Sequence, residues 1–386
     1  MKPVRFGVAG VCGAIGGTNV RAIRETPGAE LVAVTDLNEG GAAQVAAAVG
    51  CEALRNFDWI VKRADIGAVC LCTPTREHGK QALAALKAGK HVLVERPLAL
   101  TVDEADKVLA AAEKAGKTVG VMYPERLRPA ARAAAAAMSQ GRLGAIYRVT
   151  LVHTAFRTQH AFDAAPWRGT WAGAGGGVVM QQGLPFLDLL ACLMGLPKRV
   201  AAWTATQTHS IETEDMATAM LEFEGGAQGM VHFNTTQAPG ESYLEIVGDL
   251  ATLRLSGADL RFYRPATPLK RFIYADRSHI YASPECTEQH APPAQADATH
   301  ADVVADFVYA VQHNRAPQCD GASGMKSLEL ADAILVSAML GKPVDLPVNR
   351  SAAKRLLKQG KPAQPAASAP PSSASPPQAG SGKMKA

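Results

Sequence analysis

A glycine-rich turn near the start of the chain has the composition of a phosphate-binding site. It reads G-V-C-G-A-I-G over residues 10–16 and separates a strand-like apolar run from a helix-like one. A turn of this kind brings backbone N–H groups at a helix start close to a pyrophosphate. The spacing departs from G-x-G-x-x-G. Val11 stands where Gly13 and Gly16 require the first glycine, unless Gly10 takes that place in a turn one residue longer.

Asp36 ends the next strand-like run, about 20 residues after the turn. Its carboxylate can accept hydrogen bonds from both ribose hydroxyls of an adenosine and would repel a 2′-phosphate. The two features together predict a dinucleotide site that takes NAD in preference to NADP. The alternative is a tight turn next to an unrelated acid, because glycine turns are common in proteins of every class.

A second group of side chains could serve a substrate. Arg96 follows a strand-like run, and its guanidinium stays protonated, so it can polarise an oxygen but cannot act as a base. Tyr123 ends another such run, at the sheet edge where ligands bind in parallel α/β folds. The loop FRTQHAFDAAPWRG holds His160, Trp167 and Arg168, and that arginine could bind a carboxylate or phosphate in bidentate fashion.

These residues need a scaffold, and the hydrophobic pattern of the first domain predicts one. Five short apolar runs alternate with amphipathic stretches of helical spacing, which is typical of βαβ units and a parallel sheet. The sequence therefore predicts an α/β protein whose first domain, residues 1–124, is a doubly wound Rossmann fold. The strand-like runs are 4–10, 30–36, 67–72, 91–95 and 118–123.

The pattern changes after residue 125. A long strand-like run (146–156) precedes the stretch GGGVVMQQGLPFLD at 175–188, and alternating strand-like runs with short turns follow it. We predict a second α/β domain over 125–349, with an open, mostly antiparallel sheet and two closing helices. Residues 350–386 are rich in Pro, Ala and Ser without periodicity, and we predict a disordered basic tail there.

Composition restricts the partners of this protein. The net charge is +5, but residues 351–386 hold six basic residues and no acid, which leaves the rest of the chain nearly neutral. A nearly neutral chain lacks the excess positive charge with which proteins bind nucleic acid. The cysteine and histidine spacing fits no metal site, and the chain begins directly with a strand-like run, without a signal peptide or 18 consecutive apolar residues. We therefore expect a cytoplasmic protein that binds neither metal nor membrane.

From TPTREHGKQALAALKAGKHVLVERPLAL (73–100) onward, the chain resembles the Gfo/Idh/MocA family of sugar and cyclitol dehydrogenases. The resemblance continues in order through Trp167-Arg168, the triple glycine at 175–177 and the closing GKPVDLP, and it covers nearly all of residues 1–349. It implies an NAD(P)-binding Rossmann domain followed by a domain with an open sheet. It also implies homodimers or homotetramers formed through that sheet, and a small-molecule substrate.

The resemblance extends the set of expected site residues. For the cofactor the set is Gly10, Cys12, Gly13, Ala14, Ile15, Asp36, Thr73, Pro74, His78, Glu95 and Arg96. For the substrate it is Arg126, Trp167, Arg168 and Gln181, and the candidates for catalysis are Arg96, Gln181, Tyr123 and His160.

Three positions depart from the catalytic pattern of the family. Arg96 replaces the lysine of E-K-P, and Gln181 and Pro185 replace the aspartate and histidine of GGGxLxDxGxHxxD. Oxidation of an alcohol gains roughly 10²–10⁴-fold from a group that accepts the hydroxyl proton, and none of these three side chains can do so near neutral pH. Pro185 also requires the helix to begin near Gly183, where proline is tolerated.

Arg96 can still stabilise negative charge on a carbonyl oxygen during reduction, with the proton coming from water or another site group. We therefore expect an NAD(P)-dependent oxidoreductase that acts on a sugar derivative or a small carbonyl compound. The alternative is a catalytically silent NAD(P)-binding sensor or regulator that keeps the pocket without the chemistry. Unusual chemistry such as NAD-assisted glycoside cleavage is a third, less favoured reading.

Overall fold

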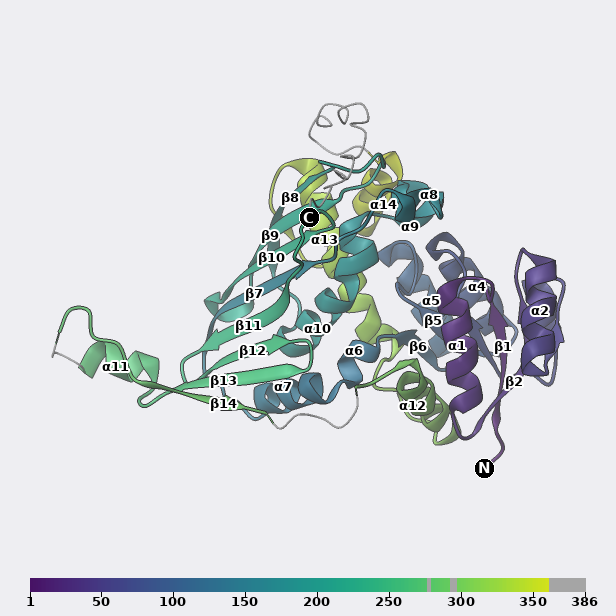
Figure 1. Cartoon of the computed structure of the whole chain (residues 1–386), viewed down its shortest axis with the longest axis horizontal. Coiled ribbons are helices and arrows are strands. Elements are labelled where there is room, and N and C mark those ends of the chain that lie inside the picture. Colours follow the sequence, from purple (N-terminus) through teal and green to yellow (C-terminus); the bar gives the residue numbers. More distant parts are fainter. Residues whose placement is uncertain (276–278, 292–296, 361–386) are drawn as a thin grey trace, which may run out of the picture.

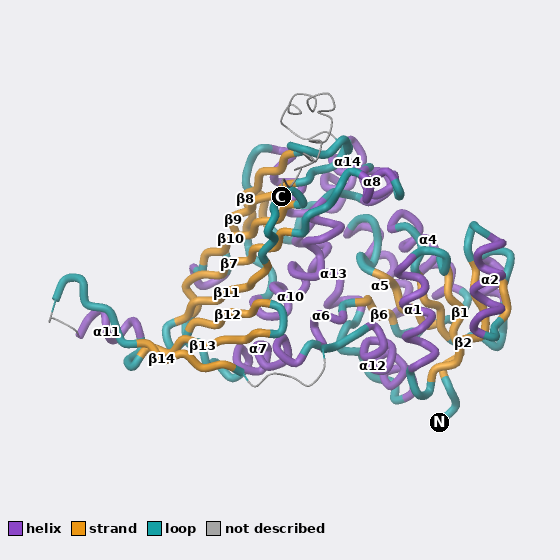
Figure 2. The backbone as a smooth tube through the Cα atoms, in the orientation of Figure 1, coloured by secondary structure: helices purple, strands orange, loops and turns teal. Residues whose placement is uncertain are grey.

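The computed structural model describes residues 1–275, 279–291 and 297–360. Two sheets organise these residues: a six-stranded sheet with helices on both sides, and a nine-stranded sheet with helices on one face (Figure 1). Figure 2 shows the strands of the larger sheet side by side on the left and the smaller sheet among its helices on the right.

The smaller sheet is entirely parallel, in the order β3-β2-β1-β4-β5-β6, as the sequence predicted. The order reverses between β1 and β4, and the crevice at the carboxyl ends of two such strands is where dinucleotides bind in doubly wound folds. The strands are β1 (Val4–Ala9), β2 (Ala29–Thr35), β3 (Glu52–Ala53), β4 (Ala68–Leu71), β5 (His91–Glu95) and β6 (Val119–Met122). The helices are α1 (Ala14–Glu25), α2 (Glu39–Val49), α3 (Phe57–Lys62), α4 (Thr75–Lys87) and α5 (Val102–Ala115).

The larger sheet has the order β14-β13-β12-β11-β7-β10-β9-β8-β15 and is antiparallel except where β10 pairs with β7. This confirms the predicted open, mostly antiparallel sheet. Its strands are β7 (Ile146–Thr154), β8 (Arg199–Ala205), β9 (Met216–Glu222), β10 (Gln228–Asn234), β11 (Ser242–Gly248), β12 (Thr252–Ser256), β13 (Asp259–Pro265), β14 (Cys286–His290) and β15 (Val344–Asp345).

Helices cover one face of the larger sheet (Figure 1). The short helices α6 (Pro124–Leu127), α8 (His160–Asp163), η1 (Pro166–Gly169), α9 (Trp171–Ala174), η3 (Glu224–Gly226) and α11 (Leu269–Ala275) lie in connections. The remaining helical elements are α7 (Pro129–Ser139), the short π-helix η2 (Val179–Gly183), α10 (Leu184–Met194), α12 (His300–Gln312), α13 (Gly321–Leu340) and α14 (Arg350–Gln359).

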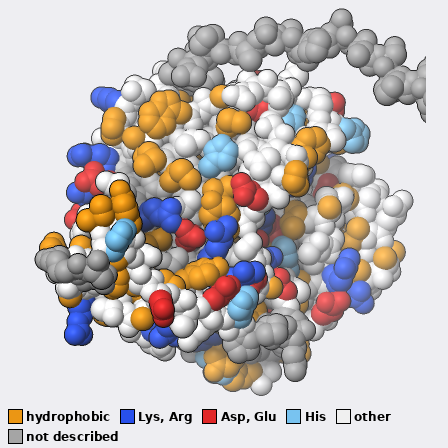
Figure 3. Space-filling view, turned by 60° about the vertical axis from the view of Figure 1, so that its left-hand side comes forward, with side chains coloured by type: hydrophobic (Ala, Val, Ile, Leu, Met, Phe, Trp, Pro, Cys, Tyr) orange, Lys and Arg blue, Asp and Glu red, His pale blue; other side chains and the backbone are white. Residues whose placement is uncertain are grey.

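The opposite face of the larger sheet is uncovered and apolar in part. Strand register puts Trp203, Met220 and Met230 on neighbouring strands of this face, and all three are exposed. Figure 3 shows hydrophobic side chains gathered on this side of the molecule. Contiguous apolar patches are typical of protein–protein contacts. Oligomer formation through this sheet stays a prediction.

The predicted domain boundary is wrong at the C-terminal end of the chain. Helix α12 packs against α1 and β1, and Phe307 on α12 contacts Phe6 on β1 with ring centroids 6.1 Å apart. The backbone N–H of Val121 also donates to the carbonyl of Cys319. Residues 300–320 therefore complete the first domain, although they lie far from it in the sequence, because the apolar strands of a parallel sheet need helices on both faces.

The prediction of a disordered tail is also wrong for its first ten residues. Asn349 caps α14 by accepting from Ala352 N, Arg350 pairs with Asp106 and Glu329, and Lys354 pairs with Asp103. The prediction missed a short amphipathic helix next to a low-complexity stretch, and the rest of the predicted tail, 361–386, lies outside the described residues.

The helical segment Trp171–Met194 has a window with a mean hydropathy of 1.4, long and apolar enough to cross a membrane by composition alone. Within the fold, 67% of that window is buried. A core helix has the same composition, and the contacts of α10 with α13, α7 and β7 fit that role.

Asp332 on α13 is a buried acid at the start of α5. Its Oδ2 accepts a 3.2 Å hydrogen bond from Val102 N, and its Oδ1 has no partner within the described residues. Burial raises the pKa of Asp332 to about 8, against the hydrogen bond from Val102 and with help from the charge of Glu329. Arg350 and Glu104 also face this carboxyl group.

Replacing Asp332 with Asn is expected to remove a pH dependence of stability. The folded pKa lies above the unfolded value of about 3.9, so the folded state holds an extra proton. Its contribution to stability is complete below about pH 4 and is lost as the pH rises toward 8. Asp332→Asn mimics the protonated acid and should raise the free energy of unfolding at pH 8 by about 1–3 kcal/mol, as measured by urea unfolding.

Asp103→Asn is the matched control for this experiment. Hydrogen bonds from Lys107 and Lys354 lower the pKa of Asp103 to about 2, so this acid does not titrate between pH 5 and 8. Its replacement should change the stability equally at both ends of that range. An equal change for Asp332→Asn would contradict the protonation of Asp332 in the folded state.

Candidate functional site

The glycine turn after β1 is tightly packed on one side and open on the other. Gly10 has a φ of 86°, and a Cβ there would lie 2.6 Å from the carbonyl oxygen of Cys72. A Cβ on Gly16 would lie 2.2 Å from the carbonyl oxygen of Gly10, so α1 can approach the strand end only because this residue is glycine. A Cβ on Gly13 would meet nothing within 4 Å, which leaves that side of the turn free for a ligand.

The start of α1 is available to an anion. No side chain caps this helix end, and its first turn holds no acidic residue. Cys12, Gly13, Ala14 and Ile15 are all exposed there. A helix start with free N–H groups and no acidic residue in its first turn fits the pyrophosphate of a dinucleotide. The positive φ and the close packing of Gly10 are compatible with the longer register, which stays a prediction.

Asp36 lies beside this turn at the carboxyl end of β2. Its Oδ2 accepts a 2.9 Å hydrogen bond from Cys12 N, and its Oδ1 accepts a 3.0 Å bond from Asn38 N. The two bonds orient the carboxylate and leave further lone pairs for ribose hydroxyls. Leu37 beside it is 98% exposed. Its apolar side chain is available to pack against an adenine base.

Asp36→Asn is expected to weaken the preference for NADH over NADPH. The amide can still accept from Cys12 and Asn38, but it no longer repels a 2′-phosphate or binds ribose hydroxyls as strongly. Hydrogen bonds to a charged group contribute about 1.5–3 kcal/mol, so the ratio of the two dissociation constants should change roughly 10- to 100-fold. Fluorescence titration with both nucleotides measures that ratio. Asp58→Asn, on the exposed side of α3, should leave it unchanged.

His78 does not reach a ligand, contrary to its prediction as a cofactor contact. It is fully buried, with Nδ1 2.7 Å from the carbonyl oxygen of Pro97 and Nε2 2.7 Å from that of Thr73. Burial lowers the pKa of His78, although both carbonyls favour its charged form. The side chain thus joins the loops after β4 and β5, while Thr73 and Pro74 themselves stay half-exposed at the crevice.

Glu95 is also buried rather than open to a cofactor. Asn19 Nδ2 on α1 donates to it at 2.7 Å, and Nε2 of His300 on α12 lies 3.2 Å away. Burial alone would raise the pKa of Glu95, but His300, Arg96 and Asn19 outweigh it and hold the pKa below its usual value. The side chain of Glu95 therefore fixes α1 and α12 to the sheet and is not available to a cofactor, and a contact through its backbone stays a prediction.

Arg96 directly follows Glu95 and is half-buried at the carboxyl edge of the sheet. Among the described residues, no hydrogen bond or ion pair engages its guanidinium. Its charge acts on the nearby carboxylates of Glu95 and Asp188, but its donors form no hydrogen bond with either of them. The position therefore suits an anionic group or an oxygen that develops negative charge.

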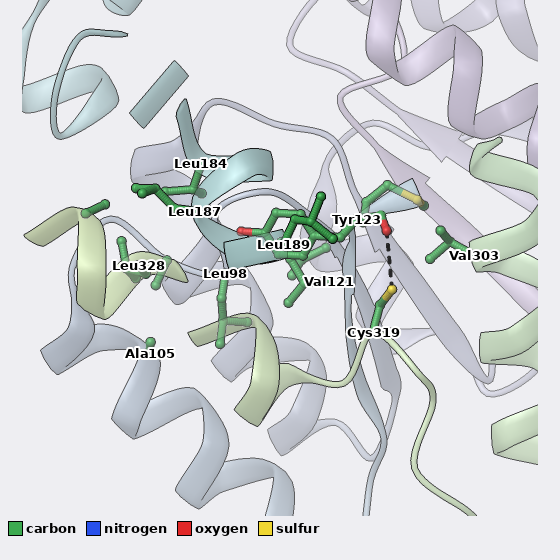
Figure 4. Packing of buried hydrophobic residues seen from close by; sticks show 14 of the residues in the cluster. Leu98, Ala105, Val121, Tyr123, Leu184, Leu187, Leu189, Val303, Cys319 and Leu328 are labelled. Atoms are coloured by element: carbon green, nitrogen blue, oxygen red, sulfur yellow. Dashed lines mark hydrogen bonds between the residues drawn. The ribbon is translucent and has the colours of Figure 1, made fainter. Parts of the chain in front are cut away.

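Tyr123 is excluded as a proton donor. Its ring is fully buried, and its hydroxyl bonds Ser327 Oγ at 2.7 Å. Burial raises the pKa of Tyr123 far above its usual range. Figure 4 shows the ring packed near Val121, Leu189 and Val303, at the junction of the two domains. Tyr123 is therefore an aromatic residue that covers the core at the end of β6.

Arg126 is not free to bind a substrate either. Its guanidinium forms two 2.5 Å bonds to the carboxylate of Asp188 on α10 and a 2.6 Å bond to Ser323 Oγ at the start of α13. A fourth bond goes to the carbonyl oxygen of Gln318. The side chain joins α6, α10 and α13 beneath the site, which is a structural role.

Gln181 and Gln182 are the two partly exposed residues of an otherwise buried segment. Every residue from 173 to 185 is buried except this pair. Pro185 has no N–H that could donate to the carbonyl of Gln181 in an α-helix. Residues 179–183 instead form a π-turn, in which each carbonyl accepts a hydrogen bond from the N–H five residues further along the chain. The helix therefore does not begin near Gly183, because helical backbone runs from residue 178 through this π-turn directly into α10 at Leu184.

Glu214 holds the start of this segment and was missed by the sequence prediction as a site residue. Both of its carboxylate oxygens lie 2.8 Å from Gly177 N, and Oε1 also accepts from Val179 N. A Cβ on Gly177 would lie 1.8 Å from the backbone oxygen of Glu214, so the third glycine permits this contact. Burial raises the pKa of Glu214 to about 7 against these three bonds. The Glu-Asp pair at 214–215 was the available signal.

The loop with His160, Trp167 and Arg168 is tied to the segment before β9. His209 connects the carbonyl of Arg157 to the buried carboxylate of Asp215, with distances of 3.0 and 3.1 Å. His160 and Arg168 are exposed, Trp167 is half-buried, and the guanidinium carbon of Arg168 lies 5.6 Å from the centre of the Trp167 ring. No hydrogen bond within the described ranges connects these three residues to Arg96 or Gln181.

The triple glycine brings the two halves of the site together. A Cβ on Gly175 would lie 3.1 Å from the side chain of Leu100, four residues beyond Arg96. The segment that carries Gln181 thus starts beside the chain that leaves β5. In the part of the chain that the structure describes, no group of three or more His, Cys, Asp or Glu side chains is placed to hold a metal ion.

Comparisons with known proteins agree with this architecture. Residues 4–123 match the oxidoreductase family with an NAD-binding Rossmann fold, and residues 131–254 match the GFO/IDH/MocA C-terminal domain. D-apiose dehydrogenase from Paraburkholderia graminis is 28% identical over 87% of this chain and 88% of its own length. 1,5-Anhydro-D-fructose reductase from Ensifer adhaerens is 26% identical over 85% of this chain and 94% of its own.

A solved structure extends the comparison over the whole fold. The WlbA dehydrogenase from Bordetella pertussis, in complex with NADH and UDP-GlcNAcA, is 30% identical and has a TM-score of 0.77. The match covers 90% of this chain and 100% of the WlbA chain. Both domains therefore align with an NADH-binding protein. The parallel sheet with its open glycine turn, the second sheet and these matches show that this chain belongs to the Gfo/Idh/MocA family of NAD-dependent oxidoreductases.

Proposed function

We propose that this protein reduces or oxidises a sugar derivative or related carbonyl compound, with Arg96 in the place of the family lysine. The observation that carries the proposal is the half-buried guanidinium of Arg96, which no partner engages among the described residues. It stands at the carboxyl edge of the sheet, next to the crevice that fits the dinucleotide. Relatives whose names denote sugar dehydrogenases and reductases support the substrate class.

Each side chain at this edge has a role that its chemistry allows. Bound NAD(H) provides or accepts the hydride. Arg96 donates hydrogen bonds to the reacting oxygen and stabilises negative charge on it. Gln181 and Gln182 can orient hydroxyl groups through both donors and acceptors, but they cannot take up a proton. The proton reaches the product oxygen from solvent or from the exposed His160, since Tyr123 and Arg126 are buried and engaged.

Reduction is the direction that this set of residues favours. A carbonyl oxygen gains negative charge as it is reduced, and a fixed cation stabilises that charge at any working pH. Oxidation of an alcohol requires a base close to the hydroxyl group, and neither Arg96 nor Gln181 can be one.

The experiment is a spectrophotometric assay of NADH oxidation against aldoses, ketoses, anhydro-ketoses and nucleotide-linked sugar acids. Turnover that depends on one of these compounds supports the proposal. Tight binding of NADH without turnover on the whole panel would contradict it and favour the alternative function, an NAD(H)-binding sensor. The sensor is the second candidate because Arg96, Gln181 and Pro185 replace all three residues of the family's catalytic pattern.

A further inference from the structure

A short segment before β9, residues 212–215, is attached to both parts of the chain that carry candidate substrate residues. The first part is the loop that carries Arg168. The N–H groups of Glu212 and Thr213 donate to the carbonyl oxygen of Gly169, directly after that arginine, at 2.8 and 3.3 Å. The second part is the triple-glycine stretch that leads into the π-turn. The position of both parts therefore depends on this short segment.

The carboxylate of Glu214 caps the helical stretch that contains the π-turn. Helical backbone begins at Val178, and the first N–H groups of a helix have no carbonyl partner within it. Gly177 N and Val179 N both donate to the Glu214 carboxylate, at 2.8 and 3.1 Å. Val178 N donates to the backbone oxygen of the same glutamate at 2.8 Å. One residue therefore binds three consecutive N–H groups at this helix start.

Gln181 lies one turn beyond this cap. Its N–H donates to the carbonyl oxygen of Gly177 at 2.9 Å, so the glycine that Glu214 binds also holds Gln181. Glycine restricts the backbone less than any other residue, so hydrogen bonds decide where the stretch 175–177 lies. A shift of Gly177 would therefore be passed on to Gln181 and Gln182, the partly exposed pair of this segment.

The charge of Glu214 is buried at this contact. Burial raises the pKa of Glu214 to about 7, against the hydrogen bonds from Gly177 and Val179, and the charge of Asp215 acts in the same direction as burial. The stretch 175–180 that packs against the carboxyl group has no titratable side chain. The group is therefore mostly ionised at pH 8 and mostly protonated at pH 6. Hydrogen bonds to an ionised acceptor are roughly twice as strong as neutral ones, so the ionised form holds the helix start more firmly.

We propose that Glu214 is a positioning residue for the reaction, whose carboxylate fixes the helix start and so holds Gln181 and Gln182 in place for the substrate. Glu214 itself is buried and acts through Gly177. This inference rests on the proposed function and names the residue that shapes the substrate side of the crevice.

The first test compares the kinetics of the full chain with those of Glu214→Gln, on the panel compound that is turned over fastest. Glutamine has the same size, but its NH₂ group cannot accept from Gly177 N. The variant should lower kcat/KM about 10- to 100-fold at pH 8, as a misplacement of about 1 Å does, and much less at pH 6, where the unaltered protein is protonated as well. The ratio of the two values cancels pH effects that both proteins share.

Stability separates positioning from a purely structural role. The folded pKa of Glu214 lies above the unfolded value of about 4.3, so the stability that the proton contributes is lost as the pH rises through 7. Glu214→Gln does not undergo this loss, so its urea midpoint at pH 8 should be no lower than that of the unaltered protein. Activity and stability should thus separate, whereas a residue with only a structural role would lose both together.

The second test needs no substrate. Hydrogen–deuterium exchange of the NADH-bound chain at pH 8 should be at least about 10-fold faster in the peptide spanning residues 175–183 of Glu214→Gln, as the loss of a charged hydrogen bond implies. The affinity for NADH should stay unchanged. Glu224→Gln is the matched control, because Glu224 is exposed in the turn between β9 and β10, and it should alter neither exchange nor kinetics.

Unchanged exchange in the peptide 175–183 overturns the inference. A loss of activity that is equal at pH 6 and pH 8, or that accompanies a lower urea midpoint, overturns it as well. Failure of the proposed function gives a different result. Absence of turnover on the whole panel contradicts that function, and the exchange measurement then decides whether Glu214 holds the segment that carries Gln181.

Discussion

Replacing Arg96 with Ala is expected to lower kcat for carbonyl reduction by about 10²–10³-fold, the loss typical of removing one donor to a developing oxyanion. The affinity for NADH should change little, because the pyrophosphate and ribose sites lie at the ends of β1 and β2. The guanidinium interacts most strongly with the charge of the transition state, so kcat should fall more than KM rises. Steady-state kinetics and NADH fluorescence titration on the same preparation separate the two effects.

Two control variants make this prediction specific to the site. Arg96→Lys keeps a cation and should retain much of the activity, but its single ammonium group loses the fixed fork of donors. Arg21→Ala removes an exposed arginine on α1 and should leave both parameters unchanged. Full activity of Arg96→Ala would contradict the proposed role. A parallel loss of NADH binding would assign Arg96 to the cofactor and leave the reacting oxygen without its stabilising group.

The first domain could be predicted from the sequence because its signals are local. Each apolar run of the parallel sheet is separated from the next by a stretch whose apolar residues have helical spacing. Thr101 also caps α5 by accepting a hydrogen bond from Glu104 N. The glycine turn and Asp36 were found for the same reason, since strand, turn and helix are contiguous. The packing of α12 onto β1 could not be found in this way, because about 300 residues separate Phe6 from Phe307.

The site beyond the cofactor turn depends on contacts that no local pattern contains. Tyr123 lies at a strand end, as ligand-binding residues do, but Ser327 on α13 binds its hydroxyl and buries it. The π-turn at Gln181 and Gln182 has a local cause, because Pro185 lacks the N–H that an α-helix would need there. Its attachment follows from a remote one, the carboxylate of Glu214 against Gly177. Sequence therefore identified the right segments and assigned several of their side chains wrongly.

Replacing Arg126 with Met is expected to lower the free energy of unfolding by about 3–5 kcal/mol. The side chain of Arg126 is 7% exposed and that of Asp188 is fully buried, so the variant leaves a buried carboxylate without its bidentate partner. Breaking a buried pair from one side costs this much because the remaining charge has neither water nor a counter-charge. Urea unfolding followed by circular dichroism at pH 7 measures the change.

Arg199→Met is the matched control, because Arg199 also pairs with acids, Asp345 and Glu222, but is 53% exposed. An exposed pair contributes about 0–1 kcal/mol, so this variant should lose far less stability. The double variant Arg126→Met/Asp188→Leu should recover part of the loss, because it leaves no buried charge unpaired. Equal losses for Arg126→Met and Arg199→Met would contradict a stabilising role for the buried pair. The structural role of Arg126 would then be unsupported. Its burial alone would argue against a role in substrate binding.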